Sequence, residues 1–229
     1  MNIQKDNAMQ QIRTQFDEMS KVVLQQLDLL EKIINGGVTV ISDEMLKEMN
    51  ANEERTDQYE VQITDDIIDV IVLQKPVASD LRQVMAVYQM VANLERIGDS
   101  VMNIIRYIPR IQDTEVYLKM SEVITNMLMA SVSMVRKSIL SFVSNDKEEA
   151  IWTIKNDVVV DEMNHKLIKK AITKSKFSEE IQQLLFTFIQ LNSIISTIER
   201  IADHATNIAE ASIYAIEGKD LRHQKDIDE

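Results

Sequence analysis

Residues 94–104 read LERIGDSVMNI and residues 198–208 read IERIADHATNI, so one motif returns after 104 positions (198 − 94). Around the first copy, apolar or small residues recur in alternating steps of three and four, which is the spacing of one apolar seam along a helix. This seam consists of Val84, Val87, Val91, Leu94, Gly98, Val101 and Ile105. The same offset carries it, without a gap, onto Phe188, Leu191, Ile195, Ile198, Ala202, Ala205 and Ala209. A duplicated pattern of this length predicts that the chain consists of two similar helical units.

Helix-breaking residues are scarce and mark where each helix should end. Only four Gly and two Pro occur among 229 residues, which favours few and long helices. The breaks predict six helices, near residues 5–35, 43–74, 78–107, 114–143, 146–173 and 178–216. The expected N-cap residues are Asp43, Ser79 and Ser178. The predicted fold is therefore all-α, with two tandem three-helix units at residues 5–110 and 111–218 and a C-terminal tail at 219–229.

Composition and charge narrow the class of function. Apolar residues make up 45% of the chain and charged residues 27%, as in an ordinary soluble globular protein. The net charge of −12 repels phosphate backbones, so nucleic acid is not expected as a partner. The longest uncharged stretch, residues 182–198, is shorter than the ~20 residues that a membrane span requires. Since the N-terminal segment shows no export signal, we expect a cytoplasmic protein that reaches a membrane only through its partners.

Pairs of acidic residues lie beside the apolar seam in both units. Glu95 and Asp99 are four positions apart, so both carboxylates leave the same side of the helix about one turn, or ~6 Å, apart. Glu199 and Asp203 repeat this pair in the second unit. The preceding helix of each unit carries a second polar stripe, formed by Glu53, Asp57 and Glu60 in the first unit and by Asp157, Asp161 and Asn164 in the second.

If the two pairs of a unit face each other, four carboxylates converge at the edge of the core, where unpaired ionised groups are strongly unfavourable. A bound cation would resolve that conflict. The chain has no Cys and only three His, and oxygen ligation suits Mg, Mn, Ca or Fe ions rather than a structural zinc. The expected metal ligands are Glu53, Asp57, Glu95, Asp99, Asp157, Asp161, Glu199 and Asp203, with Glu60, Asn164 and His204 as further candidates. The alternative is that these acids lie on a solvated rim and pair with Arg55, Arg96, Arg200 or lysines.

The segments LERIGD and IERIADHATNIAE resemble the two signature segments of the PhoU phosphate-uptake regulator family. Residues 76–82, PVASDLR, are similar to the family's P-x-A-x-D-L-R start of the third helix, and residues 218–223, GKDLRH, to its C-terminal ending. The opening Arg13-x-x-Phe16-Asp17 is similar as well, so the resemblance covers nearly the whole chain. The second unit departs from the pattern, because it has Glu180 and Leu184 in place of the Pro and Asp of PVASDLR.

Membership of this family implies a pair of three-helix bundles whose E(D)-x-x-x-D motifs hold metal ions or multinuclear iron clusters at the eight acids named above. It further implies a non-enzymatic cytoplasmic regulator that binds the ATPase of the phosphate ABC transporter and its sensor histidine kinase. Such a regulator represses phosphate uptake and phosphate-starvation genes when phosphate is plentiful. We also expect a homodimer.

Two other functions stay open at this point. A soluble companion of a sodium–phosphate symporter would carry the same motifs. A metal-storage or redox bundle is the second alternative, and Glu162-x-x-His165 has the spacing of ferritin-like di-iron sites, but it occurs once. No nucleophile elbow, Gly-rich phosphate loop or basic cluster appears, so no enzyme is expected. Ser100 stands where the second unit has His204, so the two metal sites need not be equivalent.

Overall fold

A computed structural model describes residues 3–172 and 181–222, apart from the side chains of residues 3, 165–172, 181–183 and 185. These residues form α1 (Ile3–Asn35), α2 (Asp43–Asp69), α3 (Ser79–Tyr107), α4 (Thr114–Ser144), α5 (Lys147–Ile172) and α6 (Ile181–Glu217). One turn of π-helix, η1 (Val70–Gln74), extends α2, and a 3₁₀ turn, η2 (Ile108–Arg110), follows α3. No strand occurs in the described part of the chain, so the all-α prediction is confirmed.

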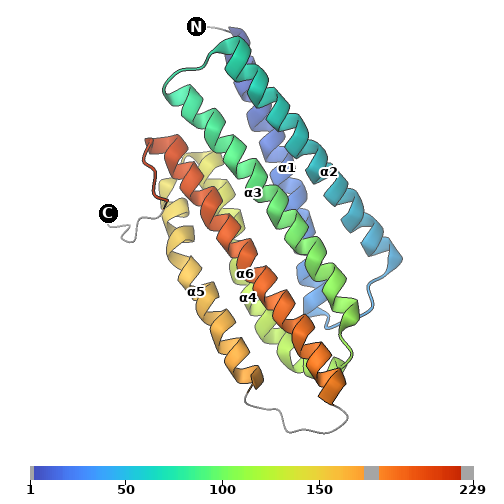
Figure 1. Ribbon diagram of the computed structural model, residues 1–229. Coiled ribbons are helices and arrows are strands. Elements are labelled where there is room, and N and C mark those ends of the chain that lie inside the picture. Colours follow the sequence, from blue (N-terminus) through green and yellow to red (C-terminus); the bar gives the residue numbers. More distant parts are fainter. Residues whose placement is uncertain (1–2, 173–180, 223–229) are drawn as a thin grey trace.

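The helices form two three-helix bundles that lie side by side, α1–α3 and α4–α6 (Figure 1). α3 and α6, which carry the two copies of the motif, run in opposite directions and make the most extensive contact between helices. A second contact between the bundles joins α1 to α4. Both contacts pair helices that hold the same place in the sequence repeat.

One hydrophobic core continues through both bundles. All residues of the predicted seam on α3 are buried, and so are the matching residues of α6 from Leu191 onward. At the α1–α4 contact, the rings of Phe16 and Phe142 meet edge to face with their centroids 5.3 Å apart. The bundles therefore stabilise each other by shared burial of apolar surface.

The connection between α2 and α3 has a strained backbone. Lys75, which follows η1, has a φ of 45°, and Ala78, which precedes α3, has a φ of 48° with a ψ of −114°. Positive φ values cost residues with a Cβ on the order of 1–3 kcal/mol each, so they persist only where the surrounding structure holds them.

Two of the predicted helix caps are wrong. The N-cap of α2 is Ser42, whose hydroxyl accepts a backbone N–H from the first turn, and Asp43 is the first helical residue. The N-cap position of α3 belongs to Ala78, so Ser79 does not cap this helix with its side chain. Ser178 lies outside the described residues.

Among the described helices, α4 is the one long and apolar enough to cross a membrane by length and composition alone. Its most apolar window of 18 residues has a mean hydropathy of 1.3, and half of that window is buried inside the protein. Core helices of soluble proteins share these properties, so α4 is weak support for a membrane span. The longest uncharged stretch of the sequence, residues 182–198, which is too short for a span, lies in α6.

Candidate metal centres

The first acidic cluster consists of Glu53 and Asp57 on α2 and of Glu95 and Asp99 on α3. Burial raises the pKa of Glu53 to about 7 against the opposing effect of a hydrogen bond from Gln26, and the charges of Asp57 and Asp99 add to the rise. Burial likewise raises the pKa of Glu95 to about 7, with the charge of Asp99 as the next cause. Acids of the two helices therefore act on one another across the α2–α3 contact.

Two residues outside the acidic motif shape this cluster. Gln26 on α1 donates a hydrogen bond of 2.9 Å from its Nε2 to Glu53 Oε2. Gly98 on α3 has no side chain, and a methyl group there would lie 3.2 Å from Glu53 Oε2 and 3.2 Å from Gln26 Oε1. Gly98 therefore keeps room for the Glu53 carboxylate where α1, α2 and α3 meet.

The spacing of acidic pairs does not predict the contact of Gln26 with Glu53. Its signal in the sequence is a polar residue on the buried face of α1, where Val23, Leu27 and Leu30 are apolar. A fully buried amide needs a hydrogen-bond partner, and in this protein the partner of its Nε2 is the carboxylate of Glu53.

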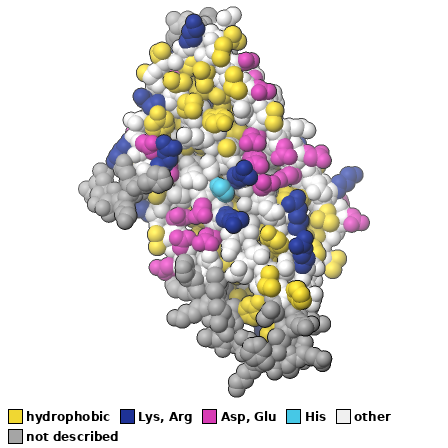
Figure 2. Space-filling model, in the orientation of Figure 1, with side chains coloured by type: hydrophobic (Ala, Val, Ile, Leu, Met, Phe, Trp, Pro, Cys, Tyr) yellow, Lys and Arg dark blue, Asp and Glu magenta, His cyan; other side chains and the backbone are white. Residues whose placement is uncertain are grey.

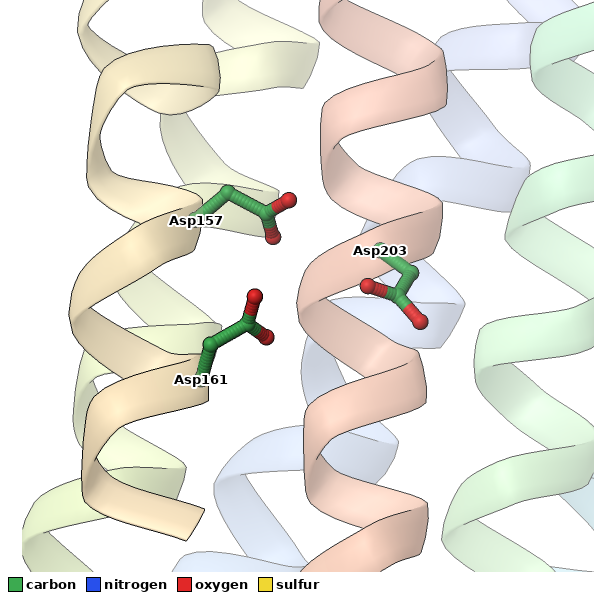
Figure 3. A group of neighbouring side chains, drawn as sticks. All are labelled: Asp157, Asp161 and Asp203. Carbon is green, nitrogen blue, oxygen red and sulfur yellow. The ribbon is translucent and has the colours of Figure 1, made fainter. Parts of the chain in front are cut away.

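The second acidic cluster consists of Asp157 and Asp161 on α5 and of Glu199 and Asp203 on α6. Figure 3 shows Asp157 and Asp161 pointing from successive turns of α5 toward Asp203. One oxygen from each of these three carboxylates lies within 4.8 Å of the other two. Among the residues with described side chains, no other three acids or histidines meet this distance, so the first cluster is wider.

Burial and mutual repulsion affect the acids of the second cluster as well. Burial raises the pKa of Asp157 to about 6, and the charges of Asp203 and Asp161 add to this rise. Burial, followed by the charge of Asp161, also raises the pKa of Asp203. Asp157 Oδ1 is buried and accepts no hydrogen bond of normal geometry from the described residues, although the Thr206 hydroxyl is close enough to lower the pKa of Asp157. A buried carboxylate oxygen of this kind, beside two further carboxylates, fits a hard cation with oxygen ligands.

The two clusters differ in the length of one acid. The repeat offset matches Glu53 with Asp157 and Gly98 with Ala202. In the first unit, the longer Glu53 is combined with Gly98, which has no side chain. In the second unit, the shorter Asp157 is combined with Ala202, which has a methyl group. This difference supports the expectation that the two sites are not equivalent.

The three further ligand candidates have different surroundings. The charge of Glu60 contributes to the raised pKa of Glu95, and the side-chain amide of Asn164 donates a hydrogen bond to Glu199. His204 lies at the α3–α6 contact, where its Nδ1 is 3.0 Å from Asn93 Oδ1. As metal ligands, these three residues and the eight acids remain predictions. The side chain of His165 lies outside the described residues.

The predicted alternative, a rim of solvated ion pairs, is present in part at the first cluster. Arg96 Nε lies 3.5 Å from Glu95 Oε2, and its Nη1 lies 3.7 Å from Asp99 Oδ2. These distances are long and the arginine is 64% exposed, so the pairs are weak. Arg96 lowers the pKa of Glu95, but burial and the charge of Asp99 still raise it overall.

Both clusters belong to one face of the molecule. Figure 2 shows two areas of acidic side chains, one over α2 and α3 and the other over α5 and α6. A histidine and basic side chains lie between them, along the α3–α6 contact. Burial, followed by the charges of Arg96 and Arg200, lowers the pKa of His204.

Several relatives of the chain share one description. The PhoU domain family matches residues 16–108 and residues 124–212, one match in each unit. A "phosphate-specific transport system accessory protein PhoU homolog" of Aquifex aeolicus is 32% identical over 216 residues, which cover 94% of each protein. A Burkholderia protein with the same description is 28% identical over 225 residues, covering 97% of this chain and 93% of its own length.

Solved structures show the same fold. PhoU from Pseudomonas aeruginosa superposes with a TM-score of 0.80 at 21% identity, covering 93% of this chain and 99% of that one. The phosphate transport system regulatory protein PhoU from Streptococcus pneumoniae has a TM-score of 0.79 at 23% identity, covering 94% and 98%. With a domain match in each unit and a relative 32% identical over nearly its full length, this chain belongs to the PhoU family.

Proposed function

We propose that this protein is a cytoplasmic negative regulator of phosphate uptake and of the phosphate-starvation response. The observation that carries the proposal is family membership over both units, together with relatives that are named accessory proteins of the phosphate-specific transport system. We infer that it acts, as a homodimer and without catalysis of its own, by binding the ATPase of a phosphate ABC transporter and a sensor histidine kinase.

We further propose that both acidic clusters bind divalent metal or iron ions, with Mg, Mn, Ca and Fe as the candidates. In the second cluster, Asp157, Asp161 and Asp203 would hold the ion, with Glu199 beside them. In the first cluster, the ligands would be Glu53, Asp57, Glu95 and Asp99. A bound cation would offset the mutual repulsion among the carboxylates of each cluster.

In each bundle, the protein sets the distance between an outer helix, α2 or α5, and the inner helix that it packs against, α3 or α6. Asp157 and Asp161 on α5 repel Asp203 on α6, as the raised pKa of Asp157 indicates. When that repulsion is balanced, α5 is held against α6, and the same reasoning applies to α2 and α3. The outer helices then present a defined surface to a partner.

The test is a deletion strain that carries a phosphate-starvation reporter. We expect deletion to raise reporter activity at high phosphate, and expression of the full chain from a second site to restore repression. Co-purification with the transporter ATPase tests the inferred contact directly. A reporter that stays repressed after deletion would contradict the regulatory proposal.

The same strain separates the alternatives. If the chain serves a sodium–phosphate symporter, its effect on phosphate uptake persists after the ABC transporter is removed. If it is a storage or redox bundle, the purified protein oxidises Fe(II) with oxygen and the deletion leaves the reporter unchanged.

A further inference from the structure

A second surface, at the end of the first bundle that holds the α2–α3 connection, exposes large apolar side chains. The hairpin patch consists of Val61, Ile68, Val72, Leu73, Val77, Leu81, Met85 and Tyr88, all of which are exposed. Three of them, Val72, Leu73 and Val77, are 62%, 69% and 72% exposed. Figure 2 shows the hydrophobic side chains gathered over this end of the molecule. A cluster of this size on a surface marks an interaction site more often than a scatter of single residues does.

The backbone holds the hairpin patch in place. The positive φ values of Lys75 and Ala78 enclose Val77, the most exposed of the large apolar residues of the patch. On one side, Lys5 of α1 binds the carboxylate of Asp80. On the other, Arg82 packs against Gly218, where an added methyl would lie 3.1 Å from the arginine Nε. The surrounding contacts thus fix a strained turn that presents apolar side chains to solvent.

The hairpin patch continues into a groove between α2 and α3. The groove has a volume of about 290 Å³ and is lined by Glu60, Val61, Thr64, Asp65, Tyr88 and Ala92. On α3, Leu81, Met85 and Tyr88 follow steps of four and three, so they share one side of the helix. The stripe on α2 from Val61 to Val72 is ~16 Å long, which matches about three turns of a docked helix.

Charge decides which occupant fits. Residues 60–82 contain five acids, Glu60, Asp65, Asp66, Asp69 and Asp80, and two bases, Lys75 and Arg82. Even with Lys5 of α1 paired to Asp80, acids outnumber bases around the patch. Asp65 and Asp69 are exposed beside the apolar stripe. Two copies of this chain that met at the patch would bring these acids against each other, and an anionic membrane would be repelled in the same way.

We propose that the hairpin patch docks an amphipathic helix of a partner protein, with an apolar face flanked by Lys or Arg residues. Apolar side chains of the helix fill the groove between α2 and α3, and its basic residues meet the acids at the rim. This assignment deepens the proposed function and rests on it only for the identity of the partner. Glu60 belongs both to the groove and to the surroundings of Glu95, so the docked helix lies next to the first acidic cluster.

The test uses the full chain and a fluorescein-labelled peptide of 18 residues, made of Leu and Lys with the leucines at helical spacing. A second peptide has the same composition without that spacing, and a third has Glu in place of Lys. The patch variant is Leu73→Ser, Val77→Ser and Tyr88→Ser combined. Its matched control changes three exposed apolar residues of α4, as Met129→Ser, Leu140→Ser and Val143→Ser. Circular dichroism confirms that both variants fold.

We expect fluorescence anisotropy to show saturable binding of the spaced Leu/Lys peptide to the wild type and the control variant, with at least tenfold weaker binding to the patch variant. Asp65→Asn with Asp69→Asn should weaken binding and reduce its dependence on salt. Equal binding to the patch variant, equal binding of the unspaced peptide, or no binding by 100 µM protein overturns the proposal.

Two further outcomes would show that the hairpin patch binds something other than a partner helix, and each would overturn the proposal. One is a dimer in sedimentation that dissociates only in the patch variant. The other is co-sedimentation of the wild type, but not the patch variant, with vesicles of phosphatidylglycerol and phosphatidylethanolamine. The peptide measurement uses purified protein and does not depend on the reporter strain. A failure of the docking proposal can therefore be distinguished from a failure of the proposed function.

Discussion

Raising the pH from 5 to 7.5 should destabilise the metal-free protein, because three carboxyls of the acidic clusters hold protons more tightly in the folded state. Burial raises the pKa of Glu53 and of Glu95 from 4.5 to about 7, and the pKa of Asp157 from 3.8 to about 6. When an acid has a higher pKa in the folded state than in the unfolded chain, folding is favoured while that acid is protonated. Stability then falls as the pH rises from the unfolded pKa to the folded one. The window here runs from about pH 4 to pH 7.

The size of the loss follows from these shifts. For an isolated group, a rise in pKa from 4.5 to about 7 corresponds to ~3 kcal/mol of stability. Water reaches these partly buried side chains, and Glu53 and Glu95 respond to some of the same neighbours, so we reduce each contribution to ~1 kcal/mol. The free energy of unfolding should therefore drop by ~3 kcal/mol in total across the window.

Urea unfolding in EDTA, followed by circular dichroism between pH 4.5 and 8, measures this drop. Glu53→Gln combined with Glu95→Gln should remove most of it, whereas Glu48→Gln with Glu54→Gln, two exposed acids of α2, should retain it. Saturating Mn²⁺ should abolish the drop, because ion binding strengthens as the carboxyls lose their protons. A free energy of unfolding that stays level or rises with pH in EDTA would refute the reasoning.

Three further predictions concern the clusters and the core. Asp99→Ala combined with Asp203→Ala should lower the metal content of the purified protein in elemental mass spectrometry, and an unchanged metal count would refute the site assignment. Gly98→Ala should weaken metal binding at the first cluster by about tenfold in calorimetric titration, because the new methyl crowds Glu53 Oε2 at 3.2 Å. Adding Glu53→Asp should restore affinity by reproducing the combination of the second unit, and a double variant no better than Gly98→Ala would contradict this reading. Phe16→Ala should cost ~3–5 kcal/mol and leave a single unfolding transition in calorimetry, because its ring joins the two bundles, whereas two separate transitions would show that the bundles unfold independently.

The six helices could be predicted because their signals are local. The apolar seam on α3 follows from steps of three and four, and scarce Gly and Pro residues mark the ends of the helices. The π-turn at Val70–Gln74 and the positive φ of Ala78 could not be predicted this way, because contacts with α1 and with the end of α6 hold that connection in place. The N-cap of α2 is Ser42 rather than Asp43. Both residue types favour this position, and sequence patterns do not fix the start of a helix to within one residue.

Sequence could predict the part of the candidate site that depends on spacing within a single helix. Spacing within one helix identified the pairs Glu53/Asp57 and Glu95/Asp99, and the repeat identified their counterparts. Which residues of other helices join them depends on packing. Gln26 approaches Glu53 from α1, and Asn93 approaches His204 across the α3–α6 contact. No spacing rule relates residues that lie so far apart in the chain.

The pairing of equivalent helices between the bundles bears on the origin of the chain. A half-length ancestor of three helices would have left the apolar sides of its first and third helices uncovered. Two identical copies related by a two-fold axis would cover both sides, with third helix against third helix and first against first, as α3 meets α6 and α1 meets α4 today. Gene duplication and fusion would then have turned a symmetric dimer into one chain, and the freed second half could lose PVASDLR while the first half kept it.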